Sequence, residues 1–218
     1  TPEHRRPVSL ARANPLGALL AVTRLRHLRA PLATFLILSV AMNVYPAVWA
    51  YFGQARFGWG TAMIGASLAI YGLSFAAGQA LLVGPLIRRF GEHRAAFWGM
   101  WVNVCTLTGM GLVISGPAAL AIIPITALGG VVNPALQAIL SRDTAANAQG
   151  ELQGVLASLN AIAMITSPLV MTATFAAFTA PGASIYAPGA PFLLAALLMV
   201  AAIALHVAGT RATRPATL

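Results

Sequence analysis

The chain has 218 residues, of which 59% are hydrophobic and only 8% are charged. A typical soluble domain carries about 25% charged residues, so this chain has too few to cover a water-soluble globule, and its composition indicates a membrane protein. The formal net charge of +9 does not indicate nucleic-acid binding, because the arginines lie between apolar runs and form no basic face interleaved with aromatic residues.

Residues 1–30 form a basic segment that precedes the first apolar run and carries six arginines. Asn14 followed by Pro15 is typical of a helix start, and the leucines that follow fall on one side of such a helix. We predict either an amphipathic helix on the cytoplasmic membrane surface or a basic linker. No signal peptide is visible, and because the chain begins with Thr1 we expect a fragment or a processed product.

Six apolar runs without Asp, Glu, Lys or Arg follow, and each is long enough to cross a bilayer, which takes about 20 helical residues. Backbone groups cannot remain unpaired in lipid and no alternating β-barrel pattern is present, so we predict an all-α membrane domain over residues 31–210. The predicted transmembrane helices are 31–53, 61–83, 95–115, 117–140, 152–180 and 187–209, followed by a cytoplasmic tail at 211–218. Prolines at positions 46, 124, 134 and 168 lie inside these spans and should kink them.

The distribution of arginine predicts how the spans are oriented. All 13 basic residues are Arg, and twelve of them fall on one side of the six-span arrangement, whereas only Arg56 falls on the other. By the positive-inside rule we predict that both termini are cytoplasmic and that the chain is a multi-pass protein of the inner membrane, with the lipid bilayer as its first partner.

Residues 84–94 are predicted to form a short charged loop, which makes the second and third spans antiparallel neighbours. Arg88, Arg89 and Arg94 lie in this loop on the predicted cytoplasmic side. Glu151 lies on the same side, near the start of the fifth span, where a negative charge complements the helix dipole. We expect Glu151 to form an ion pair with one of these three arginines in one conformational state.

The sequence shows no catalytic or metal-binding set of residues. The four acids all fall in predicted polar segments, the four histidines are scattered without metal-ligand spacing, and no phosphate-binding loop occurs. We therefore predict that the chain is not an enzyme and has no cofactor. Cys105 lies in an apolar run and is interpreted as a small packing residue.

Uncharged polar side chains within the spans are the candidate site residues, because they need partners on other helices or in a wet cavity. The candidates are Asn43, Tyr71 and Asn160 near the span centres and Gln79, Asn133 and Gln137 toward the cytoplasmic ends. For each of them, an interhelical hydrogen bond is the alternative to contact with a ligand. Tyr45, Trp49 and Tyr51 are interpreted as an aromatic belt at the membrane interface, with a lid over a cavity as the alternative.

The loop between the second and third spans is similar to the Gly-x-Leu-x-Asp-Arg-x-Gly-Arg-Arg signature of the major facilitator superfamily, as it recurs in the second half of these transporters. Gly84, Leu86, Arg89 and Gly91 fit the signature, whereas Arg88 stands at the position of its acid. With six spans and both ends inside, the chain resembles the C-terminal half of such a transporter. The resemblance implies a 3+3 inverted repeat.

A more specific resemblance is to the tetracycline/proton antiporter branch of the drug:proton antiporters, over residues 14–178. It is carried by residues 133–142 and 149–154, with further matches at 49–57, 71–80 and 84–85. Asn103 stands where this branch has a membrane-embedded Asp, and Phe75 stands where it has a His. Because Asn cannot carry a proton and Phe cannot bind a polar drug group in the same way, the resemblance supports the branch and not tetracycline itself as the substrate.

The resemblance implies one half of an alternating-access carrier, whose substrate binds near the midplane between this bundle and an N-terminal six-helix half in the same or a separate chain. The first, second, fourth and fifth spans would then face the cavity, with the third and sixth at the periphery. The proton-coupling acids of the family lie largely in the other half. Protons and a small drug-like molecule are therefore the expected partners of the whole transporter.

Two alternatives stay open on the sequence. A truncated remnant or an assembly subunit that does not transport would also lack acids within its spans and an initiating Met. A carrier of the same fold for a metabolite, such as a sugar, would show the same spans and the same loops.

Overall fold

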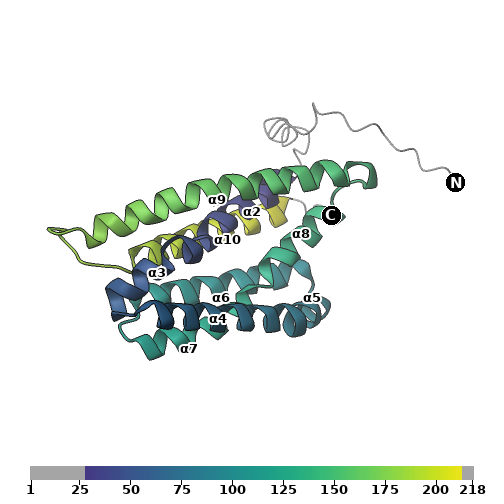
Figure 1. Ribbon diagram of the computed structural model, residues 1–218. Coiled ribbons are helices and arrows are strands. Elements are labelled where there is room, and N and C mark those ends of the chain that lie inside the picture. The colour runs from purple at the N-terminus through teal and green to yellow at the C-terminus, as the bar shows by residue number, and fades with distance from the viewer. Residues whose placement is uncertain (1–27, 213–218) are drawn as a thin grey trace.

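The computed structural model describes residues 28–212, and over that range the chain is helical without any strand. Most of the helix or linker predicted for residues 1–30 and the last residues of the tail predicted at 211–218 lie outside the described range. The helices join into antiparallel rods that run side by side along the molecule (Figure 1). The predicted all-α class is confirmed.

Consecutive helices of the described residues join end to end into rods. In chain order they are α2 (Arg29–Met42) with α3 (Val44–Phe57), α4 (Thr61–Gly78) with the π-helix η3 (Gln79–Val83) and α5 (Gly84–Phe90), α6 (Glu92–Leu112), α7 (Gly116–Gly129) with α8 (Val132–Arg142), η4 (Ala146–Ala148) with α9 (Gln149–Thr179), and α10 (Ala190–Ala212). Five of the described rods are long and apolar enough to cross a membrane. The remaining described rod, α6, is less apolar because it begins with charged residues and carries Asn103 near its middle.

The charged loop predicted at residues 84–94 is helical instead. The second rod continues from α4 through η3 into α5, so the chain remains helical as far as Phe90. The π-helical turn directly before Gly84 and Pro85 accommodates the proline within a continuous rod. Gly91 alone makes the turn, with a φ of 77° and a ψ of 161°, a conformation that residues with a side chain rarely adopt.

Two rods are interrupted near their centres. α2 and α3 meet at Asn43, three residues before Pro46, and α7 and α8 meet at Gly130 and the residue after it, ahead of Pro134. Each proline lacks the N–H that would have bonded the carbonyl four residues earlier, and the helix is weakened at that point. The kinks predicted at these two prolines are present as helix breaks, whereas α7 continues through Pro124 and α9 through Pro168.

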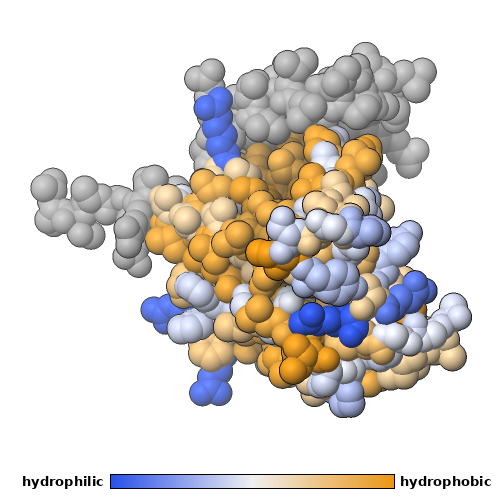
Figure 2. Space-filling view, turned by 90° about the vertical axis from the view of Figure 1, so that its left-hand side faces the viewer, coloured by the Kyte–Doolittle hydropathy of each residue, from blue (hydrophilic) through white to orange (hydrophobic). Residues whose placement is uncertain are grey.

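The packing leaves two rods far more open than the others. In the most apolar stretch of each rod, only 11% is buried in the α4–α5 rod and 17% in the α9 rod, against 56% in α2–α3 and 50% in α7–α8. α10 packs along α2 and α6, α4 packs along α7, and α9 lies along α2 and α3 (Figure 1). In chain order, the first and fourth rods are broken and the second and fifth rods are the most open. Hydrophobic and weakly polar residues cover most of the end of the molecule seen in Figure 2.

The main core includes a cluster of aromatic rings contributed by α3 and α10. Phe52 and Phe192 are completely buried, with ring centroids 4.9 Å apart in an edge-to-face arrangement. Trp49 packs against both rings and is buried, as is Tyr45, so the interfacial belt predicted for these two residues is wrong. Their rings point inward because they share the face of α3 that meets α10. Tyr51, in contrast, is exposed as a membrane anchor requires.

We predict that Gly189→Ala lowers the stability of the bundle. A β-carbon at Gly189, just before α10, would lie 1.9 Å from the carbonyl oxygen of Gly111 near the end of α6, so backbone would have to move. Overpacking of this kind costs about 1–3 kcal/mol. The thermal unfolding midpoint of the detergent-purified chain should fall for Gly189→Ala and stay unchanged for Gly72→Ala, whose β-carbon meets nothing within 4 Å. Equal midpoints for the two variants would contradict this account.

Candidate functional site

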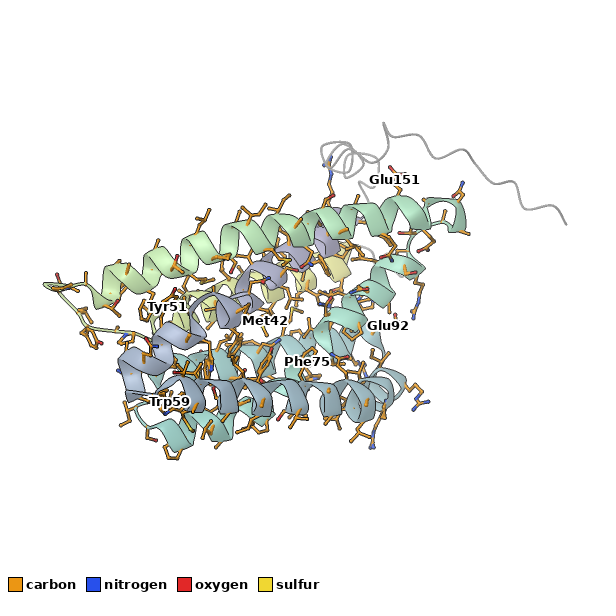
Figure 3. All side chains as sticks on the ribbon, in the orientation of Figure 1. Met42, Tyr51, Trp59, Phe75, Glu92 and Glu151 are labelled. Atoms are coloured by element: carbon orange, nitrogen blue, oxygen red, sulfur yellow. The ribbon has the colours of Figure 1, made fainter. Side chains whose placement is uncertain are left out.

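A cavity of about 390 Å³ lies at the break between α2 and α3, within the range of about 300–1,000 Å³ that is usual for small-molecule sites. Its walls come from α2, α3, α4 and α7 and from the break itself: Met42, Asn43, Tyr45, Pro46, Trp49, Leu68, Tyr71 and Ile123. Figure 3 labels Met42 at the break and Phe75 on α4. No lining residue is charged, and within residues 28–212 no three His, Cys, Asp or Glu side chains could together hold a metal ion.

The break at Asn43 supplies the cavity with polar groups. Pro46 has no N–H, so it cannot bond the carbonyl oxygen of Met42, which lies four residues earlier. The side-chain nitrogen of Asn43 donates back to the carbonyl oxygen of Ser39 at 2.7 Å, within its own helical turn. Asn43 lines the cavity, so its side-chain oxygen is a hydrogen-bond acceptor that this break adds to the wall.

Aromatic rings form much of the cavity wall. The rings of Tyr45 and Tyr71 lie 5.5 Å apart at 30°, and Tyr71 stacks on Phe75 at 6.1 Å and 15°. Within the described part of the chain the buried Tyr45 hydroxyl has no hydrogen-bond partner, which costs free energy unless a ligand or water supplies one. Trp49 is held in place, because its Nε1 donates to the hydroxyl oxygen of Ser67 at 2.9 Å. The arrangement suits a flat organic molecule that stacks on rings.

Two of the six predicted site residues, Asn43 and Tyr71, lie together at this cavity. Asn160 lies elsewhere, exposed on α9. Asn133 and Gln137 are exposed on α8, where the side-chain nitrogen of Gln137 donates to the side-chain oxygen of Asn133 at 3.0 Å. Two of the candidates therefore lie at the cavity and three lie on exposed helix faces, whereas Gln79 lies at neither place.

Gln79 and Asn103 meet the α7–α8 break rather than the cavity. The side-chain nitrogen of Gln79 donates to the carbonyl oxygen of Gly130 at 3.1 Å. Asn103, at the position of the embedded Asp in the resembled branch, is almost fully buried, and its Nδ2 donates to the carbonyl oxygen of Gly129 at 3.4 Å. For Gln79 the structure thus shows the interhelical hydrogen bond that was the alternative to ligand contact.

Most of the cavity wall was not predicted from the sequence. The lining residues that were missed or interpreted differently are Met42, Tyr45, Pro46, Trp49, Leu68 and Ile123. A usable signal existed in Asn43-x-x-Pro46, because a polar residue just ahead of a mid-span proline marks a break beside which space can open. The apolar wall residues on α4 and α7 carry no such signal.

The three arginines of the predicted loop motif lie near the junction of α5 and α6, at one end of the rods. Arg88 and Arg89 on α5 and Arg94 on α6 are exposed. The ion pair at this end joins Arg142, at the end of α8, to Glu92, at the start of α6. Since the Arg142 side chain is largely exposed, this pair contributes about 0–1 kcal/mol.

The ion pair expected between Glu151 and Arg88, Arg89 or Arg94 is not formed in this state. α9, which carries Glu151, packs along α2 and α3, whereas α5 packs against η3 and α6. α8 contacts both α6 and α9 and so lies between the two groups of charges. Figure 3 shows Glu151 on α9 above α8 and Glu92 on α6 below it.

Apolar antiparallel rods, with an uncharged cavity at the break in one of them, define a multi-pass helical membrane protein. No protein-family model matches the chain. It is 38% identical over 173 residues to the tetracycline resistance protein, class C, of Escherichia coli, a match that covers 79% of this chain and 44% of that protein. It is 39% identical over 166 residues to the class G protein of Vibrio anguillarum, covering 76% of this chain and 42% of that protein.

These matches show that the chain is related to the tetracycline resistance proteins, and the predicted resemblance to this branch of the major facilitator superfamily is confirmed. A third relative, the class E protein of Escherichia coli, is 34% identical over 67% of this chain and 36% of its own length. The chain spans less than half the length of the curated relatives it matches. The prediction that the chain is not an enzyme agrees with this relationship.

We predict that Ser67→Ala destabilises the cavity wall. Trp49 and Ser67 are both buried, so the loss of the serine hydroxyl leaves a buried indole N–H without its acceptor. An unsatisfied buried donor costs about 1–3 kcal/mol. The thermal unfolding midpoint should fall for Ser67→Ala and not for Ser158→Ala, whose hydroxyl bonds only to the Gly154 carbonyl on its own helix. A midpoint that stays unchanged in both variants would show that Ser67 is not the acceptor that matters.

Proposed function

We propose that this chain is one half of an alternating-access carrier that exports a drug-like organic compound. The observation that carries the proposal is its relationship to the tetracycline resistance proteins, which are named for resistance to a drug. The cavity supports it, because a space of about 390 Å³ with aromatic walls suits a small organic molecule. Asn43 and Tyr71 are the proposed substrate contacts, through a hydrogen bond and ring stacking respectively.

The second half of the carrier is proposed to cover the open faces of α4, α8 and α9. Asn133, Gln137 and Asn160 are exposed there, although amide side chains in lipid need polar partners. A second helical bundle, or water held between two bundles, would supply those partners. The relatives are more than twice as long as the matched segment, which supports a second bundle of similar size.

The two broken rods are proposed to provide the change in access. Asn43 at the α2–α3 break and Ile123 on α7 both border the cavity, so bending at a break would open or close one side of it. The described acids Glu92, Asp143 and Glu151 all lie at rod ends. If protons drive the export, the coupling acid within the membrane is therefore proposed to come from the second half.

The arginine-rich end of the rods is proposed to face the cytoplasm, with both termini on that side of the inner membrane. Arg88 and Arg94 lie near the junction of α5 and α6, and Arg142 joins them through its ion pair with Glu92. Arg56 lies at the opposite end, where its Nε donates to the carbonyl oxygen of residue 113 at the end of α6. This asymmetry is what the positive-inside rule requires.

We predict that Tyr71→Ala weakens substrate binding in the carrier assembled from this chain and its second half. Loss of an aromatic contact of about 0.5–1.5 kcal/mol raises the apparent KM for export up to about tenfold. The measurement is uptake of a panel of drug-like compounds, tetracycline included, into energised inverted vesicles. Tyr51→Ala is the matched control, because this tyrosine is exposed and lies outside the cavity.

Equal kinetics for Tyr71→Ala and Tyr51→Ala with every exported compound would remove the cavity from the substrate path. Asn43→Ala should raise the apparent KM in the same direction as Tyr71→Ala, because both residues line the same space. Export of sugars without export of any drug-like compound would instead favour a metabolite carrier. An assembled protein that moves nothing would favour the remnant.

The proposed second half also predicts where water reaches the bundle. In a Cys105→Ser background, Asn160→Cys in the assembled carrier should react readily with N-ethylmaleimide, because water between the halves allows the reactive thiolate to form. Val200→Cys on α10, an exposed position outside the proposed interface, should react slowly because it faces lipid. Equally slow reaction at both positions would place Asn160 against lipid and contradict the proposed interface.

A further inference from the structure

The α7–α8 break contains a backbone acceptor that a side chain from another rod satisfies. Pro134 has no N–H, so it cannot bond the carbonyl oxygen of Gly130, which lies four residues earlier. In a membrane span an unpaired carbonyl is costly. The side-chain nitrogen of Gln79 donates to this oxygen at 3.1 Å. Gln79 therefore takes the place of the backbone donor that the proline lacks.

A second amide bonds the neighbouring carbonyl. The Nδ2 of Asn103, on α6, donates to the carbonyl oxygen of Gly129 at 3.4 Å. A β-carbon at Gly129 would lie 1.9 Å from the side-chain oxygen of Asn103, so only glycine permits this approach. That oxygen is buried and finds no partner within the described residues. A half-satisfied amide on a long hydrogen bond is easier to release than a fully bonded one.

The rod that carries Gln79 is itself irregular at this point. Gln79 is the first residue of the π-helix η3, and a β-carbon at Gly78 would already lie 3.0 Å from the carbonyl oxygen of Ala127 on α7. π-helical turns occur mostly as local irregularities at functional sites. Here the turn begins beside a close contact between α4 and α7, so three rods meet at the α7–α8 break.

We propose that Gln79 and Asn103 are positioning residues that form a reversible amide clamp on the α7–α8 break and thereby set the angle between α7 and α8. α8 carries the exposed amides Asn133 and Gln137, whereas α7 carries the cavity residue Ile123. Release of the clamp frees α8 to move while α7 keeps its place at the cavity. The existence of the clamp does not depend on the proposed function, whereas a role of the clamp in transport rests on it.

Hydrogen–deuterium exchange of the full chain in phospholipid nanodiscs tests the clamp. Gln79→Met keeps the length of the side chain but cannot donate, so the amides of residues 130–137 should exchange about fivefold faster, the effect of roughly one lost hydrogen bond. Gln54→Met is the matched control, because Gln54 is an exposed glutamine on α3. Exchange in Gln79→Met that equals the control would overturn the proposal.

Pro134→Ala tests whether Gln79 acts through the carbonyl of Gly130. Alanine at this position restores an N–H that can donate to the same oxygen, so Gln79→Met should then change the exchange rate by less than about twofold. An equal acceleration in both backgrounds would show that Gln79 acts by packing alone, and would overturn the proposal. Gln79→Ala provides the same comparison if Gln79→Met does not fold.

Export kinetics separate this inference from the proposed function. In the assembled carrier, Gln79→Met should change turnover while the apparent KM stays within about twofold, because Gln79 does not line the cavity. A changed KM with unchanged turnover would overturn the positioning role. If the assembled carrier transports nothing, the proposed function fails, whereas the exchange results still decide whether the clamp exists.

Discussion

Backbone groups inside a bilayer must find partners within the protein, and each proline in a span removes one donor. This constraint accounts for both irregular places in the bundle. At Pro46 the carbonyl of Met42 loses its helical donor beside the cavity, whereas at Pro134 the carbonyl of Gly130 is bonded by Gln79. The same missing donor therefore produces a polar site beside the cavity in one rod and a break bonded by a side chain in the other.

The cavity and the α7–α8 break are linked because the same two rods contribute to both. The rod of α4 and η3 contributes Tyr71 to the cavity and, about two turns later, Gln79 to the break. α7 contributes Ile123 to the cavity and ends at Gly129, where Asn103 bonds it. Because packed helices shift as rigid bodies between discrete arrangements, a displacement of α4 against α7 changes both places at once. This is a physical route by which an occupied cavity can influence the angle of α8.

The relationship to the tetracycline resistance proteins explains why the chain is a bundle of membrane helices. Individual side chains explain the contacts made within that bundle. Asn103 and Phe75 stand where the resembled branch has an Asp and a His. In the structure, Asn103 bonds the backbone of Gly129 and Phe75 stacks on Tyr71. Both positions therefore hold neutral contacts between helices, in keeping with a cavity that has aromatic walls and no charged lining residue.

The sequence by itself determined the all-α membrane class, because long uncharged runs can satisfy their backbone in lipid only as helices. It also determined the resemblance that the relatives confirm. It also placed Asn43 and Tyr71 among the candidates, since polar side chains in spans are rare. Only the tertiary structure decided that Trp49 points inward, that Glu151 lies away from the loop arginines and that Gln79 bonds a helix break. The physical reason is that a nearly uniform apolar pattern does not specify how a rod is rotated about its axis, and each of these partners lies on another rod.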